Sequence, residues 1–345
     1  MNQVLVGIDS GGTRTNVEVL VESENGVEHK TYETTDSLSG TLAPDLIPEV
    51  LRKIFAPLEM HIEELNAVGL PVFAWFSAAG FSPWTRDDYA IGLDELVPDY
   101  LVGSLKTLGA ANDAVSLLLG SGSDGVVIAG TGSNIMLQSK DGEIHQSGGH
   151  DWVACDYGSG FWIALRSIRQ AYRDHEAGQE SVLLHRFEEV YGIDPDDRRS
   201  LIAKLRDLSV SDRNMKKEIA KFAANVCAAA ERGDAGAQNI VKAEAEDLAD
   251  IMAGSLRRNF SSEELTQGIV LVQGGSVLDN DFYRVAFETQ LDMRLRLGED
   301  RNAQIEWQRV TTVGEAAINL ARAISTDPTP LLKVDRSFRP AVVHA

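Results

Sequence analysis

The chain has 345 residues, of which 43% are hydrophobic and 24% are charged, and its formal net charge is −20 at pH 7. This length and composition predict a globular protein with room for two domain-sized cores, and they exclude fibrous and disordered classes. The strong negative charge argues against a nucleic-acid partner, because it would repel a phosphate backbone. A phosphate ligand would therefore need a local site made of backbone N–H groups and a metal ion.

No hydrophobic run reaches the roughly 18 residues that a membrane helix needs, and the chain opens directly on a strand-like pattern. We therefore expect no membrane partner and a cytoplasmic location. The two cysteines, Cys155 and Cys227, lie far apart and outside any CxxC pair. This spacing supports neither a disulfide framework nor a zinc site, so we expect reduced thiols.

The patterns in the first third of the chain predict three antiparallel strands, followed by alternating helices and strands. Hydrophobic residues at every second position mark the strands, and Pro48 fits the first turn of the first helix. The expected elements are strands at Val4–Ile8, Val17–Val21 and Val27–Tyr32, a helix at Asp45–Leu58, a strand at Ala67–Phe76, a helix at Asp87–Leu96 and a strand at Leu101–Leu108.

From Gly125 the same order of patterns begins again, with a strand, a turn at Thr131–Ser133, a second strand, a hairpin turn at Asp141–Gly142 and a third strand. Almost continuous helix is expected over residues 158–260. The remaining expected elements are a strand at Gly268–Gln273, a helix from Asp279, a strand at Gln304–Val310, a helix at Val313–Ile324 and a tail without clear periodicity at Pro328–Ala345.

This repetition predicts two α/β domains, each started by a hairpin. The first is expected to span residues 1–115, with the helix at 313–325 as a candidate addition to it. The second is expected to span residues 116–312 and to carry a helical insertion, and residues 326–345 form the tail.

A glycine-rich turn separates the first two strands. Gly11 and Gly12 can adopt positive φ and direct backbone N–H groups, including that of Thr13, toward a phosphate. Asp9, just before them, could hold a magnesium ion. The turn alone is equally compatible with an ordinary hairpin, because short glycine motifs are weak evidence. It is neither a dinucleotide fingerprint, since a strand and not a helix follows it, nor a P-loop, since no Gly-Lys-Ser/Thr occurs in the chain.

Two further strands end in similar turns. The strand Gly125–Ala129 is followed by Gly130–Ser133, and the strand Gly268–Gln273 is followed by Gly274–Ser276. Three such turns, with Asn112 and Asp113 between the first two, predict a bipartite phosphate clamp.

These segments resemble the BadF/BadG/BcrA/BcrD group of actin-like ATPases, and within it the N-acetylglucosamine kinases. GIDSGGTRT is similar to the first phosphate loop, AGTGSN to the second and VQGGSV to the adenosine loop, and SGGHDWVACDYGSGFWIA resembles the Gly-Gly-Trp-Gly segment followed by Gly-Asp-Glu-Gly-Ser. The resemblance covers almost the whole chain. It implies an α/β fold of two ribonuclease H-like (actin-like ATPase) domains with a nucleotide cleft between them.

The resemblance also implies an ATP-dependent sugar kinase that uses ATP and Mg²⁺, with a small-molecule sugar as its partner, and we further expect a homodimer. Asp113 matches the catalytic base of the family, and Asp9 is the metal ligand that we expect from its place after the first strand. The matching ATP-binding residues are Gly11, Gly12, Thr13, Gly130, Thr131, Gly132, Gly274, Gly275 and Ser276. The matching substrate residues are Ser133, Asn134, Gly149 and Asp156, and we expect His150 and Asp151, in the same segment, to lie near the substrate as well.

Both key aspartates have a plainer alternative as helix caps. Asp113 precedes the expected helix Ala114–Leu119, and Asp156 precedes the expected helix Gly158–Tyr172. A carboxylate that caps a helix can also accept a proton from a sugar hydroxyl, so both roles stay open for Asp113.

The sequence departs from the family pattern in the sugar half of the expected site. His150 and Asp151 stand where the family has Trp-Gly, Tyr157 stands where it has Glu, and the loop Thr34–Leu38 lacks a Ser-Asn pair. These changes leave the identity of the sugar open. The simpler interpretation of His150 and Asp151 is a loop histidine that is hydrogen-bonded to its neighbour. Alternatively, Asp151 could pair with a cationic amine, which would favour glucosamine over its acetylated form.

Three other functions compete with a kinase. An ATPase that activates an iron–sulfur enzyme would use Cys155 as a cluster ligand, but Cys227 lies in a helical run without a second motif. A sugar-sensing regulator would need a helix-turn-helix, which the acidic chain does not begin with. A relative that only binds nucleotide would not need both Asp9 and Asp113.

Overall fold

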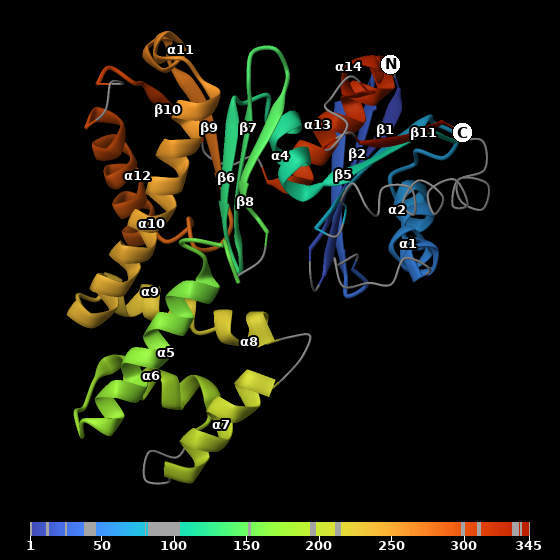
Figure 1. Ribbon diagram of the computed structural model, residues 1–345. Helices are drawn as coiled ribbons and strands as arrows, with labels where there is room; N and C mark the ends of the chain where they lie inside the picture. The colour runs from blue at the N-terminus through green and yellow to red at the C-terminus, as the bar shows by residue number, and fades with distance from the viewer. Residues whose placement is uncertain are drawn as a thin grey trace. The chain divides into compact units, whose positions relative to one another are not determined.

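The chain forms two compact units in the computed structural model (Figure 1). The structure describes residues 2–11, 14–24, 26–37, 46–79, 81, 104–150, 153–193, 198–210, 215–297, 301–308, 312–332, 338 and 340–344. The first unit combines residues 1–124, 138–144 and 309–345, and the second combines residues 125–137 and 145–308. Each unit has its own sheet and its own helices.

A six-stranded sheet forms the centre of the first unit, in the order β11-β5-β4-β1-β2-β3. The first three strands are antiparallel, as predicted, and β4 and β5 run parallel to β1. The strands are β1 (Gln3–Ser10), β2 (Thr15–Ser23), β3 (Gly26–Thr34), β4 (Val72–Ala78), β5 (Leu105–Asn112) and β11 (Ala341–His344).

Helices cover both faces of this sheet (Figure 1). On one face, α1 (Ile47–Phe55) and α2 (Leu58–Glu64) pack against the strands, and on the other lie α4 (Asp113–Ser121) and α13 (Val313–Thr326). A Cβ at Gly7 of β1 would lie 2.6 Å from the carbonyl oxygen of a glycine in α13. Glycine therefore permits the close approach of α13 to the sheet.

The second unit repeats this strand order without the added edge strand. Its sheet has the order β10-β9-β6-β7-β8, with β7 antiparallel and β9 parallel to β6, and β10 parallel to β9. The repeat predicted from Gly125 onward is thus present in the sheet topology. The strands are β6 (Gly125–Ala129), β7 (Ser133–Gln138), β8 (Ile144–Gly148), β9 (Ile269–Gly274) and β10 (Ile305–Gln308).

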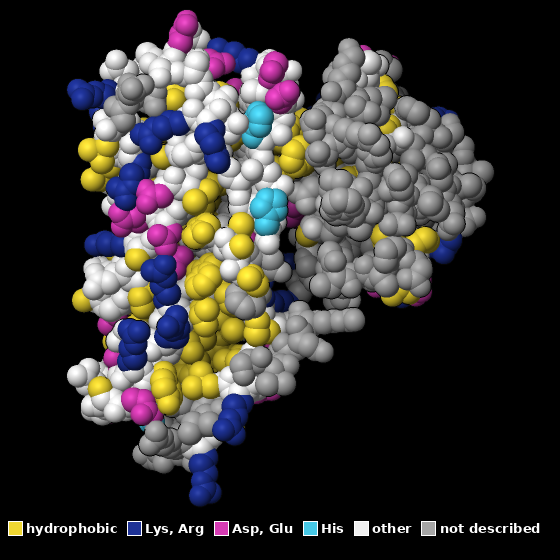
Figure 2. Space-filling model, in the orientation of Figure 1, with side chains coloured by type: hydrophobic (Ala, Val, Ile, Leu, Met, Phe, Trp, Pro, Cys, Tyr) yellow, Lys and Arg dark blue, Asp and Glu magenta, His cyan; other side chains and the backbone are white. Residues whose placement is uncertain are grey.

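Most of the second unit is helical, as the pattern over residues 158–260 predicts. The helices are α5 (Gly160–Glu176), α6 (Val182–Tyr191), α7 (Arg198–Val210), α8 (Met215–Ala220), α9 (Ala223–Glu231), α10 (Ala235–Asn259), α11 (Ser262–Gln267) and α12 (Asp281–Arg296). Hydrophobic side chains gather on the visible surface over α5 and α8 (Figure 2).

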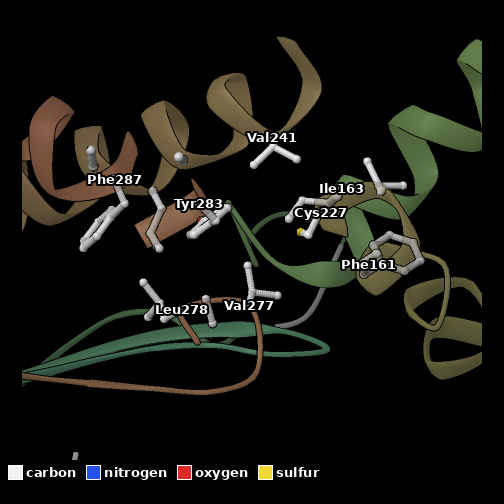
Figure 3. Packing of buried hydrophobic residues seen from close by; sticks show 14 of the residues in the cluster. Phe161, Ile163, Cys227, Val241, Val277, Leu278, Tyr283 and Phe287 are labelled. Atoms are coloured by element: carbon white, nitrogen blue, oxygen red, sulfur yellow. The ribbon is translucent and has the colours of Figure 1, made fainter. Parts of the chain in front are cut away.

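The core of the second unit lies between its sheet and the helices α10 and α12. Tyr283 and Phe287 of α12 and Val241 of α10 are fully buried and face Val277 and Leu278, which follow β9 (Figure 3). This packing holds the segment after β9 against the helices.

Two of the predicted segments are not found as predicted among the described residues. The expected helix Asp87–Leu96 lies outside the described residues. The segment expected as a tail contains the short helix α14 (Thr329–Leu332) and the strand β11, which pairs antiparallel with β5. Four residues are too few for a period-two pattern to be visible, and pairing at a sheet edge is directed by backbone hydrogen bonds instead. Among the described residues, the structure has no helix that is long and apolar enough to cross a membrane.

Candidate functional site

The first unit brings two carboxylates to one edge of its sheet. Asp9 lies near the end of β1, and Asp113 begins α4 directly after β5, with β4 between these parallel strands. Burial raises the pKa of Asp9 to about 6, with further increases from the negative charges of Asp113 and Glu18 and an opposing effect of Arg14. Asp9 and Asp113 therefore interact electrostatically.

Asp113 is available for a role beyond helix capping. The N-cap of α4 is Asn112, whose side chain accepts a hydrogen bond from the backbone N–H of Ala114 at 3.0 Å. Asp113 is the first residue of the helix, and one of its oxygens accepts from the same N–H at 2.8 Å. Burial raises the pKa of Asp113, and hydrogen bonds from backbone N–H groups partly oppose the increase. A carboxylate with a raised pKa is a stronger base.

Only part of the first glycine turn is described. The N–H of Gly11, after β1, donates to the carbonyl of Arg14, before β2, at 3.1 Å. Gly12 and Thr13 lie outside the described residues.

In the second unit, the other two glycine turns meet. The N–H of Val277 donates to the carbonyl of Ala129 at 2.9 Å, so the segment after β9 packs on the end of β6. The turn Gly130–Ser133 begins there, and in it the N–H of Gly130 donates to the carbonyl of Gly132 at 2.9 Å. In the described part of the chain, the N–H groups of Thr131 and Gly132 have no hydrogen-bond partner. They are candidates for binding phosphate oxygens.

A pocket of about 490 Å³ opens beside these two turns. Its lining combines both turns with one end of α5 and a row of small residues on α8 and α9. The pocket size and its largely apolar wall suit a small ligand such as a nucleoside. The lining residues are Gly130, Thr131, Gly160, Lys217, Ala220, Lys221, Ala223, Ala224, Cys227, Ala228, Ser276, Val277, Asp279 and Asn280.

The sequence patterns indicated the turns of this pocket but not its helical wall. Four alanines recur in the lining contributed by α8 and α9, a pattern that could have indicated a face kept free for a ligand. Gly274 ends β9, and Gly275 has a φ of +92°. Gly274 and Gly275 do not line the pocket, whereas Ser276, Gly130 and Thr131 do.

A substitution that fills the pocket tests whether ATP binds there. The exposed side chain of Ala224 lines the pocket, so in Ala224→Trp the indole should occupy the ligand's space. We expect ATP binding, measured by calorimetry, to weaken by about 100-fold or more. The helix-propensity cost should stay below about 0.7 kcal/mol, so the fold should be retained. Ala235→Trp, at an exposed position outside the lining, is the control. Unchanged ATP affinity in Ala224→Trp would rule out this pocket as the nucleotide site.

Four of the predicted substrate residues lie together at the start of β7. Ser133 and Asn134 begin the strand, and the side chain of Gln146 donates to Asn134 at 3.2 Å. A Cβ at Gly149 would lie 2.8 Å from the amide oxygen of Asn134, so these two residues are neighbours. Asp156 is the fourth, and its Oδ1 accepts a hydrogen bond from the Ser133 N–H at 3.2 Å. His150 is exposed, and Asp151 lies outside the described residues.

Asp156 is buried and makes its polar contacts with other residues of the protein. It is 2% exposed and has a φ of +62°, a conformation that few residues other than glycine adopt. The ammonium group of Lys216 on α8 lies 2.5 Å from its Oδ2. The N-cap of α5 is Ser159, so Asp156 does not cap that helix. A role of Asp156 in sugar binding stays a proposal.

The repeated strand order and the glycine turns define an actin-like ATPase fold, the class shared with sugar kinases of known structure. The chain belongs to the BadF/BadG/BcrA/BcrD ATPase family, whose sequence profile matches residues 6–298. The predicted fold class and family are therefore confirmed.

Similar proteins are known from sequence and structure. The chain is 26% identical over 292 residues to an N-acetylmuramic acid/N-acetylglucosamine kinase of Clostridium acetobutylicum. The aligned region covers 81% of this chain and 87% of that relative. A solved structure of a proposed N-acetylglucosamine kinase from Chromobacterium violaceum matches with a TM-score of 0.66 at 19% identity, over 92% of this chain and 99% of the other. Another, from Porphyromonas gingivalis, matches with a TM-score of 0.61 at 17% identity, over 93% and 99%. At these identities the structures support the fold alone.

Proposed function

We propose that this protein is an ATP-dependent kinase that phosphorylates a hydroxyl group of an amino sugar such as N-acetylglucosamine or glucosamine. The observation that carries the proposal is the pocket in the second unit, where the turns Gly130–Ser133 and Gly274–Ser276 meet. In this proposal the pocket takes the adenosine part of ATP, and the N–H groups of Thr131 and Gly132 bind phosphate oxygens.

The first unit supplies the acid–base chemistry of the proposal. Asp113 would orient the sugar hydroxyl and accept its proton as the new phosphorus–oxygen bond forms. The bond between the γ-phosphorus and the bridging oxygen breaks, and ADP leaves. Aligned N–H dipoles of the turn Gly130–Ser133 would stabilise charge on the transferred group.

Asp9 is the residue that fits a magnesium ion. Its carboxylate is half-buried, and the neighbouring charge of Asp113 disfavours ionisation further, so a divalent cation with a preference for oxygen would stabilise it. The ion would neutralise negative charge on the phosphates of bound ATP.

Support for an amino sugar as the acceptor comes from a relative. The curated relative of Clostridium acetobutylicum is named for two N-acetylated amino sugars, which supports this class of acceptor. Ser133, Asn134, Gly149 and Asp156 are the described residues that we propose near the sugar. His150 and Asp151 are proposed with them, and Asp151 is the group that would favour a free amine.

A screen of ATP consumption over hexoses, hexosamines and N-acetylhexosamines, with N-acetylmuramic acid included, tests the function. We expect turnover that depends on an amino sugar and on Mg²⁺. ATP consumption that is the same with and without every sugar would contradict the proposal. A preference for N-acetylglucosamine over glucosamine would contradict only the pairing of Asp151 with an amine.

The alternative of an iron–sulfur activator receives less support. Cys227 is 4% exposed within α9, and burial raises the pKa of its thiol to about 12, with a further contribution from Glu231. Such a thiol is a poor source of the thiolate that a cluster ligand must provide.

A further inference from the structure

A buried side chain from α10 holds the turn that precedes α5. The backbone N–H of Gly158 donates to Oε2 of Glu244 at 3.0 Å, and the hydroxyl of Tyr283 on α12 donates to the carbonyl of Gly158 at 2.7 Å. Glu244 is 1% exposed and Tyr283 is fully buried. Side chains from two different helices thus fix both polar backbone groups of one glycine.

The backbone at Gly158 adopts a conformation that favours glycine and lies close to α10. Its φ is +73°, and a Cβ there would lie 2.7 Å from Leu248 and 2.8 Å from the carbonyl oxygen of Glu244. Gly158 therefore packs directly against α10, and this contact restricts the orientation of its backbone.

A charged residue is an expensive choice for this position. Burial raises the pKa of Glu244 to about 7, while the Arg166 charge and the hydrogen bond from Gly158 oppose the increase and Asp247 adds to it. Arg166 Nε lies 2.5 Å from Oε1 of Glu244, a charge contact without an aligned hydrogen bond, and Arg166 also donates to Asp247 at 2.7 Å. Since a hydrophobic residue would often serve stability as well, the placement of Glu244 points to a requirement for its acceptor oxygen.

The turn held at Gly158 in turn supports the phosphate-binding turn. Four hydrogen bonds join the two segments, and they involve every residue of Gly130–Ser133 except Gly132. They are Ser133 N–H to Asp156 Oδ1 at 3.2 Å, Ser133 O–H to the Tyr157 carbonyl at 2.7 Å, Gly160 N–H to the Gly130 carbonyl at 2.7 Å and Phe161 N–H to the Thr131 carbonyl at 3.2 Å. A shift of the peptide at Gly158 would therefore displace the N–H groups proposed to bind phosphate.

We propose that Glu244, with Tyr283 as a second anchor, is a positioning residue that fixes Gly158 and through it the turn Gly130–Ser133. The inference rests on the proposed function in one respect, since it assigns that turn to the phosphates of ATP. Glu244 itself does not touch the ligand in this arrangement.

The test compares Glu244→Ala and Glu244→Gln in the full-length protein. Alanine removes the acceptor for the Gly158 N–H, whereas the amide oxygen of glutamine retains it. Glu246→Gln is the matched control, because Glu246 lies on the same helix and pairs with Arg294 away from the turn. Amide hydrogen exchange over residues 130–133 and 156–161 and the affinity for ATP–Mg²⁺ are measured for each variant.

We expect Glu244→Ala to accelerate amide exchange in both segments and to weaken ATP binding by about tenfold, the effect of losing one buried hydrogen bond. Glu244→Gln should restore most of both properties, and Glu246→Gln should match the wild type. Unchanged exchange over residues 130–133 in a folded Glu244→Ala protein would overturn the proposal, as would a Glu244→Gln protein as impaired as the alanine variant.

Tyr283→Phe keeps the proposal testable if Glu244→Ala does not fold. It removes only the hydroxyl that binds the Gly158 carbonyl, so faster exchange in the same two segments is expected, and unchanged exchange would count against the proposal. The exchange measurements need no sugar. A wild type that phosphorylates no sugar would therefore contradict the proposed function without affecting the result on Glu244.

Discussion

Asp113→Asn is expected to lower sugar-dependent ATP turnover by a factor of about 10²–10⁴, the usual contribution of a positioned general base. ATP binding should be retained, because the pocket that we assign to the nucleoside is lined by residues of the second unit only. The fold should also be retained, since Asn112 caps α4 and burial already disfavours the charge of Asp113. Steady-state turnover and ATP calorimetry on the same preparation test both expectations.

Glu315→Gln is the control for the loss of an acidic residue from the first turn of a helix in the same unit. Glu315 is exposed and lies in the first turn of α13, where its charge is worth roughly 0.3–1 kcal/mol of favourable interaction with the helix dipole. Its replacement should leave turnover unchanged. Full turnover in Asp113→Asn would show that another group accepts the proton of the sugar.

The glycine turns could be predicted from the sequence because each depends on a short segment. A strand that ends in Gly130–Ser133 or in Gly274–Ser276 is a local pattern, and both strands were found where the patterns placed them. That the two turns meet follows from the sheet, where β6 and β9 are parallel neighbours with Ile128 opposite Gly274. Carboxyl ends of parallel neighbours share one edge, so a correct topology already implies this part of the site.

The groups that support the turns could not be predicted, because they come from distant helices. Glu244, Arg166 and Tyr283 lie on α10, α5 and α12, and nothing in the local pattern of any of these helices marks them as partners. The same holds for Lys216, which reaches Asp156 from α8. Helical periodicity indicates which face of a helix is buried but not which residue of another helix it meets.

Gly275→Ala is expected to destabilise the second unit strongly. A Cβ at this position would contact the carbonyl oxygen of Ala129 and lie 2.6 Å from its carbonyl carbon, and both are backbone atoms that cannot rotate away. The φ of +92° adds strain for any residue with a side chain. We expect a loss of about 2–4 kcal/mol in the free energy of unfolding, from steric overlap and backbone strain together.

Gly233→Ala separates the two contributions. Gly233 lies between α9 and α10 with the same φ of +92°, but a Cβ there would meet no atom within 4 Å. It should therefore show only the backbone strain, about 1–2 kcal/mol, and normal ATP affinity. Gly275→Ala should in addition bind ATP weakly, because the overlap pushes Ser276 and the turn after Ala129 apart on the pocket lining. Denaturant unfolding and ATP calorimetry on both variants measure these differences, and equal results for the two would show that the contact with β6 does not shape the pocket.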